Sequence, residues 1–173
     1  MNTWKPIAHV AFALLLAALQ ASLLHWLGGG VLSVSLLAVC VVWAGLHGGN
    51  VDGSLAAAGI GYVMDLMAGT PKGLLTFLAV ALFLGVRAAS AAVDLRGRGA
   101  LALVSAAGAL FLSTGAMLLL RNAAGPEAAP GGELAGRMIV EAILTGAAAP
   151  VVALGLRRLD ARFQREEEPG LLG

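Results

Sequence analysis

Two carboxylates stand within long apolar stretches of the sequence, and their presence there needs an explanation. Asp65 lies in the stretch from Asn50 to Gly73, and Glu141 lies in the last long apolar stretch of the chain. A carboxylate inside a membrane costs roughly 2.5–3.5 kcal/mol on insertion scales, so it is retained where it faces protein, water or a partner. The chemistry open to such a group is hydrogen bonding or ion pairing with a neighbouring helix.

Small residues precede Asp65 at a spacing of four. Gly53, Ala57, Gly61 and Asp65 would form one ridge along a helix. Small residues let another backbone approach closely, which is how helices associate in membranes. Two interpretations stay open. The ridge is a binding face for a partner with Asp65 as its polar anchor, or the ridge packs inside the chain's own bundle and Asp65 is satisfied there or by amides near Gly73.

Glu141 also has two interpretations. It follows Arg137 by four residues, so the two can form an ion pair along one helix, worth roughly 0.2–0.5 kcal/mol. Alternatively, Glu141 and Asp65 lie at the same depth and line one polar pocket or bind one partner. Pro150 stands in the same stretch and predicts a kink, because its ring removes a backbone donor. A kink leaves room for a neighbouring helix or a cavity.

The composition indicates a membrane protein. The 173 residues are 59% hydrophobic and 12% charged, with a mean hydropathy of +0.88. A soluble domain would carry about 25% charged residues. The net charge of +1 argues against nucleic-acid binding, which needs a strongly basic surface.

Six apolar segments approach the length that spans a bilayer, roughly 17–25 residues. Gly69, Pro71 and Gly73 have typical turn chemistry and end the third segment. We therefore expect an all-α integral membrane protein, a single bundle of about six transmembrane helices over residues 1–160. A short cytoplasmic tail, residues 161–173, is expected to be disordered. The predicted spans are approximately 7–27, 31–46, 53–68, 74–93, 100–120 and 137–156.

Basic residues predict the orientation of this bundle. Six spans place both termini on one side, and the excess of basic residues there predicts that both termini are cytoplasmic. Arg157, Arg158 and Arg162 are expected to contact cytoplasmic partners or anionic lipid at the end of the last span. The basic residues on the side of the termini are Lys5, Arg96, Arg98, Arg157, Arg158, Arg162 and Arg165, and those on the other side are Lys72, Arg121 and Arg137.

No residue pattern in the sequence predicts catalysis or a cofactor. The zinc-protease, nucleophile-elbow and phosphate-loop motifs are missing, and the serines have no base at a recognisable spacing. We therefore expect a protein that is not an enzyme, with no metal site. The histidines and tryptophans are expected at the membrane interface; they are His9, His25, His47, Trp4, Trp26 and Trp43.

The stretch around Asp65 resembles a known bacterial signature. Asn50 to Gly53 leads into Gly59 to Gly73, which is similar to the pattern G-x-x-x-G-L-x-x-D-x-x-S-G-x-x-x-G of the rod shape-determining MreD family. The segment from Val140 through Pro150 to Asp160 also resembles that family, and the length and number of spans fit. Ala68 departs from the family's small polar residue, and Gly28 to Val31 replaces its Arg-Pro-Asp-like start of the second span.

The resemblance implies a non-catalytic subunit of the bacterial inner membrane that serves cell-wall elongation. Such subunits bind the bitopic protein MreC and help couple MreB filaments to the polymerase RodA and its transpeptidase partner. The family fold is similar to that of the substrate-binding subunits of energy-coupling-factor vitamin transporters. A solute-binding subunit of a small-molecule transporter is therefore the alternative function. The residues expected to serve partner binding or packing are Gly53, Ala57, Gly61, Asp65, Gly69, Pro71, Gly73, Glu141 and Pro150.

Overall fold

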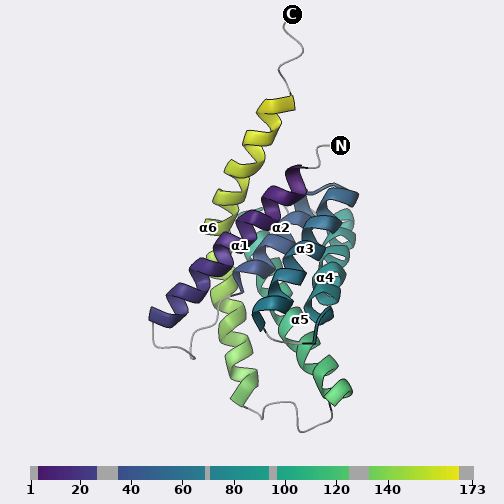
Figure 1. Ribbon diagram of the computed structural model, residues 1–173, viewed down its shortest axis with the longest axis vertical. Coiled ribbons are helices and arrows are strands. Elements are labelled where there is room, and N and C mark those ends of the chain that lie inside the picture. The colour runs from purple at the N-terminus through teal and green to yellow at the C-terminus, as the bar shows by residue number, and fades with distance from the viewer. Residues whose placement is uncertain (1–3, 27–34, 69–70, 94–96, 125–132, 168–173) are drawn as a thin grey trace, which may run out of the picture.

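The computed structural model describes residues 4–26, 35–68, 71–93, 97–124 and 133–167, which form six helices. Each predicted segment contains one helix, so the all-helical prediction is confirmed for the described residues. Figure 1 shows α1 beginning and α6 ending at the same end of the bundle, which we call the terminal end; the opposite end is the far end. The helices are α1 (Trp4–Trp26), α2 (Leu36–His47), α3 (Asn50–Ala68), α4 (Leu74–Ala92), α5 (Arg98–Ala124) and α6 (Glu133–Glu167).

Two helices differ in extent from the predicted segments. Helix α2 begins at Leu36, five residues later than predicted, and residues 31–34 lie outside the described part of the chain. Helix α6 has 35 residues and continues to Glu167, through the first part of the segment predicted as a disordered tail. Residues 168–173 of that segment lie outside the description.

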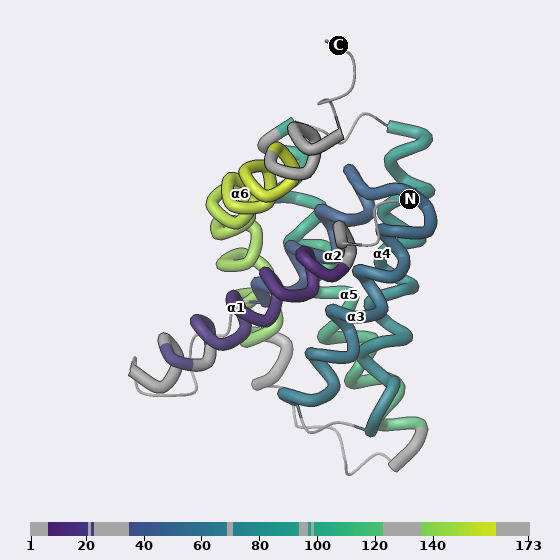
Figure 2. Tube along the Cα trace, turned by 45° about the horizontal axis from the view of Figure 1, so that its top comes forward, coloured from purple at the N-terminus to yellow at the C-terminus, as the bar shows by residue number. Residues whose placement is uncertain are grey.

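The short helix α2 forms the centre of the bundle. Every residue from Leu37 to Leu46 is buried, and α2 contacts each of the other five helices. A helix that is apolar all round is one that is buried all round, and the sequence of α2 fits that rule. Its 12 residues extend about 18 Å, less than the roughly 30 Å of a hydrocarbon core. Figures 1 and 2 show α1 running obliquely across α2 and α3, which it contacts.

The outer surface of the bundle is apolar, as expected for a protein surrounded by lipid. Large apolar side chains point outward on most helices, among them Leu15 (66% exposed), Phe77 (65%), Leu103 (74%) and Val151 (71%). By length and composition, three helical stretches of the described residues could cross a membrane: Leu74–Ala92, Gly99–Asn122 and Gly136–Ala161. Ile7–Gln20 and Leu36–His47 are shorter apolar helical stretches. The described residues thus contain three candidate spans, whereas the sequence predicts six over the whole chain.

Helices α5 and α6 contact each other and approach closely at Gly146. A Cβ atom on Gly146 of α6 would lie 3.0 Å from the carbonyl oxygen of Ala102 and 3.2 Å from the Cβ of Ala106, so this glycine permits the close approach. Pro150 stands at the middle of α6, and Figure 1 shows that α6 changes direction near its middle. Proline removes one helical hydrogen bond and is a common cause of such a bend.

Candidate functional site

Asp65 lies in the last turn of α3 and binds the first turn of α4. It is only 3% exposed. Its Oδ2 accepts hydrogen bonds from the backbone N–H of Gly73 (2.9 Å), the backbone N–H of Thr76 (3.1 Å) and the Thr76 hydroxyl (2.6 Å). Its Oδ1 accepts one from the backbone N–H of Leu75 (2.8 Å). Four donors thus converge on one carboxylate.

These hydrogen bonds make Asp65 the cap of the following helix. The first N–H groups of a helix have no partner within it, and a side chain at the N-cap position often accepts from them. Here that position is occupied by Gly73, which has no side chain and adopts a left-handed backbone with φ 95°. Glycine tolerates this conformation because it lacks a Cβ. Asp65 supplies the missing acceptor from the preceding helix and places a carboxylate at the positive end of the helix dipole.

The small-residue ridge of α3 packs against α4 and the end of α2. A Cβ on Gly61 would lie 2.6 Å from the Cα of Thr76 and 2.8 Å from the Cβ of Ala79. A Cβ on Gly53 would lie 2.6 Å from the Phe83 ring, and Ala57 between them is fully buried. Of the two interpretations of the ridge, packing within the bundle is the one that the structure shows. The ridge is covered along its length and leaves no room there for a helix of another chain.

Glu141 lies in a different environment from Asp65. It lines a cavity of about 290 Å³ at the far end. The Ser113 hydroxyl donates to Glu141 Oε2 at 3.5 Å, which is a weak hydrogen bond. The carboxylate of Asp65 is directed to α4, so the structure does not bring the two acids into one polar pocket. The other residues that line the cavity are Ala17, Gln20, Ser35, Leu37, Met64, Met67, Ala68 and Leu75.

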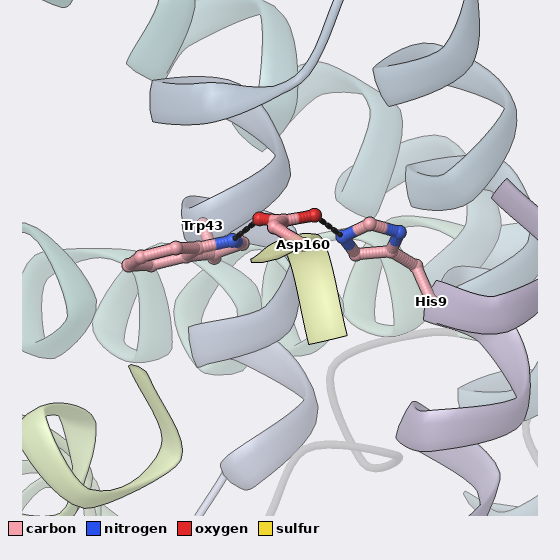
Figure 3. A network of polar contacts seen from close by, with 3 residues as sticks. All are labelled: His9, Trp43 and Asp160. Carbon is pink, nitrogen blue, oxygen red and sulfur yellow. Dashed lines mark hydrogen bonds and ion pairs between the residues drawn. The ribbon is translucent and has the colours of Figure 1, made fainter. Parts of the chain in front are cut away.

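A second buried polar cluster lies at the terminal end and joins three helices. Asp160 of α6 accepts a hydrogen bond through Oδ2 from the indole Nε1 of Trp43 in α2 (3.0 Å). Its Oδ1 lies 3.2 Å from Nε2 of His9 in α1, forming an ion pair when the imidazole is protonated. Figure 3 shows Asp160 between the two rings. His9 is 7% exposed and Trp43 is 2% exposed, so both side chains are packed inside the bundle. Their expected location at the membrane interface concerns depth in the bilayer and stays a prediction.

Two further contacts fix the Trp43 ring. The imidazole of His47, one turn further along α2, stacks on it with the ring centroids 3.8 Å apart. The guanidinium carbon of Arg157 lies 5.7 Å from the Trp43 centroid, within the range of a cation–π contact. His9, Trp43, His47, Asp52 and Asp160 also border a cavity of about 20 Å³, large enough for one water molecule.

Replacing Trp43 with phenylalanine is expected to lower the free energy of unfolding by about 1–3 kcal/mol. An aromatic ring remains, but it is smaller than the indole, and the part-buried Asp160 loses one donor, which costs about this much. Thermal unfolding in detergent micelles measures the effect. A double-mutant cycle with Asp160→Ala serves as the control. Because both variants break the same hydrogen bond, their effects should be less than additive, and full additivity would contradict the contact.

The remaining predicted site residues have separate locations. The carbonyl of Pro71 accepts from the backbone N–H of Leu74 (3.2 Å) and forms the turn before α4. Pro150 and Arg157 border a crevice between α5 and α6. Arg157 and Arg158 are exposed. Gly69 and the side chain of Arg162 lie outside the described part of the chain.

Among the described residues, no group of three or more His, Cys, Asp or Glu side chains could hold a metal ion. The sequence does not predict the His9–Trp43–Asp160 cluster. Two features of the sequence relate to this cluster. His9 lies near the start of the first apolar segment and Asp160 lies just after the end of the last one, and Trp43 and His47 are four residues apart. Comparison of the chain with protein-family profiles, with curated proteins and with solved structures finds no match.

Proposed function

We propose that this chain is a non-catalytic, multi-pass subunit of the bacterial inner membrane that serves cell-wall elongation as a scaffold of the MreD kind. Its partner would be an MreC-like bitopic protein, and MreB, RodA and the transpeptidase partner of RodA would be coupled through that assembly. The proposal rests on the resemblance in α3 and α6. The all-helical fold and the apolar outer surface are consistent with a membrane subunit.

One structural observation supports the resemblance in particular. The residues that carry the signature contact one another or the same neighbouring helix: Asp65 binds the backbone of Gly73, and Gly61 permits contact with Thr76. The signature therefore reads as the sequence of an α3–α4 hairpin, whose two helices are joined by the carboxylate of Asp65.

This role of the signature changes where a partner would bind. Since the ridge of α3 is covered by α4, an MreC-like transmembrane helix would contact outward-facing apolar surfaces instead of the ridge. Exposed apolar side chains on α1, α4, α5 and α6 offer such faces. They include Leu19, Leu84, Leu118 and Ile143. In this proposal both termini face the cytoplasm, where the basic end of α6 would meet cytoplasmic components.

Co-purification tests the proposal. The tagged full chain is co-expressed with the MreC-like protein of the same bacterium, and the complex is extracted with detergent. An unrelated bitopic protein serves as the control. We expect the MreC-like protein, and not the control, to elute with the chain. The amount of MreC-like protein that is retained is then measured for wild type and for Asp65→Ala. Each value is divided by the amount of chain in the monodisperse peak. Because Asp65 acts as a cap, retention per folded chain should be unchanged, whereas no retention by the wild type would contradict the proposal.

The cavity of about 290 Å³ favours a second candidate function, a solute-binding subunit of a small-molecule transporter. Its volume is near the lower end of the roughly 300–1,000 Å³ of ligand pockets. Glu141, Gln20 and Ser35 contribute polar groups among apolar neighbours. In this case a panel of vitamin-sized solutes should include one that raises the unfolding temperature, because a ligand stabilises the state that binds it. Glu141→Gln should weaken that effect.

A further inference from the structure

A crevice between α5 and α6 combines an apolar wall with one cationic group. It has a volume of about 160 Å³ and is lined by Leu101 of α5 and by Pro150, Ala153, Leu154 and Arg157 of α6. Leu101 and Ala153 form the buried base, each 3% exposed, whereas Leu154 forms an exposed wall. From Pro150 to Arg157 the helix rises about 10 Å, so the crevice follows α6 towards the terminal end.

The size of the crevice fits part of a hydrocarbon chain. An apolar cavity of roughly 150 Å³ takes up benzene, so about six carbon atoms fill a space of this size. The crevice opens on the outer surface of α5 and α6, where exposed Leu103 and Val151 indicate contact with lipid. An acyl chain from the bilayer can therefore enter it without leaving an apolar environment.

The charge at one end selects the kind of lipid. A guanidinium recognises a phosphate with paired hydrogen bonds, and Arg157 lies at the end of the crevice nearer the terminal end. Its guanidinium also lies over the Trp43 ring, so its position is restricted before any ligand binds. Arg158 is exposed beside it and adds a second positive charge. An occupant must then be apolar along most of its length and anionic at one end.

We propose that this crevice binds one anionic phospholipid, with an acyl chain along Leu101, Ala153 and Leu154 and the phosphate at Arg157. A helix of another protein would fit the crevice only if it carried a carboxylate at the position that meets Arg157. Every anionic lipid of the surrounding leaflet already carries both a negative charge and an acyl chain. The inference rests on the chain's location in a bilayer and is independent of its role in cell-wall elongation.

Lipid-dependent stability of the purified full chain tests the proposal. Mixed micelles containing phosphatidylglycerol are compared with micelles containing phosphatidylcholine, and native mass spectrometry counts the lipids retained. We expect the anionic lipid to raise the unfolding temperature by several degrees more than the zwitterionic lipid, with one phosphatidylglycerol retained per chain. Equal responses to the two lipids would overturn the proposal.

Two pairs of variants locate the effect. Leu154→Trp fills the crevice from its wall and should abolish the retained lipid, whereas Val151→Trp on the same helix lies outside the crevice and should keep it. Arg157→Gln should remove the preference for the anionic lipid, and Arg158→Gln should largely preserve it. Comparing two lipids within each variant cancels any loss of stability from the Trp43 contact. If all four variants respond as the wild type does, the lipids form a general annulus and the crevice is not a site.

Discussion

Replacing Asp65 with alanine is expected to lower the free energy of unfolding by roughly 2–4 kcal/mol. The loss of a helix cap costs about 0.5–2 kcal/mol, and the one fully buried donor left without a partner, the Leu75 N–H, adds about 1–3 kcal/mol, whereas the other donors are part-buried and can bind water instead. In this chain the backbone N–H groups of Gly73, Leu75 and Thr76 and the Thr76 hydroxyl all lose their acceptor. Thermal unfolding in detergent micelles, followed by circular dichroism, measures the change.

Graded variants separate the cap from other causes of instability. Asp65→Asn keeps one acceptor oxygen and should have an intermediate effect. Thr76→Val removes only the hydroxyl donor, so its effect should be the smallest of the three. An Asp65→Ala protein that unfolds at the wild-type temperature would show that the α3–α4 hairpin does not depend on this carboxylate.

Gly61→Ala is expected to destabilise the chain by about 1–3 kcal/mol, the usual cost of overpacking, although alanine favours a helix more than glycine does. The added Cβ would lie 2.6 Å from the Cα of Thr76 and 3.0 Å from the carbonyl oxygen of Leu75. Backbone atoms cannot move aside as a flexible side chain can, so α3 and α4 must separate. Gly61→Leu should be worse and should reduce the amount of monodisperse protein.

Gly85 of α4 provides the matched control. A Cβ at this position would meet nothing within 4 Å. Gly85→Ala should therefore be neutral or stabilising by roughly 0.5–1 kcal/mol, through its effect on the unfolded chain. If the two glycine variants had the same stability, the close approach of α3 and α4 at Gly61 would be contradicted.

The helices could be predicted from the sequence because apolar length and turn residues are local signals. The Gly69-to-Gly73 turn separates α3 from α4, and the apolar runs locate each helix to within a few residues at most ends. The extent of α6 was less predictable. Charged residues after Leu156 predict an exit from the bilayer, but they are compatible with a helix that continues in water.

The contacts of the acids were only partly predictable. The sequence leaves two environments open for Asp65, a partner's helix or the chain's own bundle with the amides near Gly73. It does not separate them, because a partner's helix and a neighbouring helix of the same chain would both require a ridge of small residues. The link between Trp43 and Asp160 spans 117 positions and depends on how α2 and α6 are aligned. No local pattern encodes that alignment. For Glu141, the structure places the carboxylate beside a cavity and near Ser113, which no spacing in the sequence indicates, and the pair with Arg137 stays a prediction.

The enclosed position of α2 has a consequence for how the protein is made. Helices long enough to cross a membrane can enter it one at a time and associate afterwards. With 12 residues and contacts to all five other helices, α2 cannot follow that route alone. It reaches its final place only when α6, which follows the other five described helices in the chain, has packed against it. Enclosure of α2 is therefore a late step in the assembly of this bundle, and a product truncated before α6 would leave α2 uncovered on that side and accessible to membrane proteases.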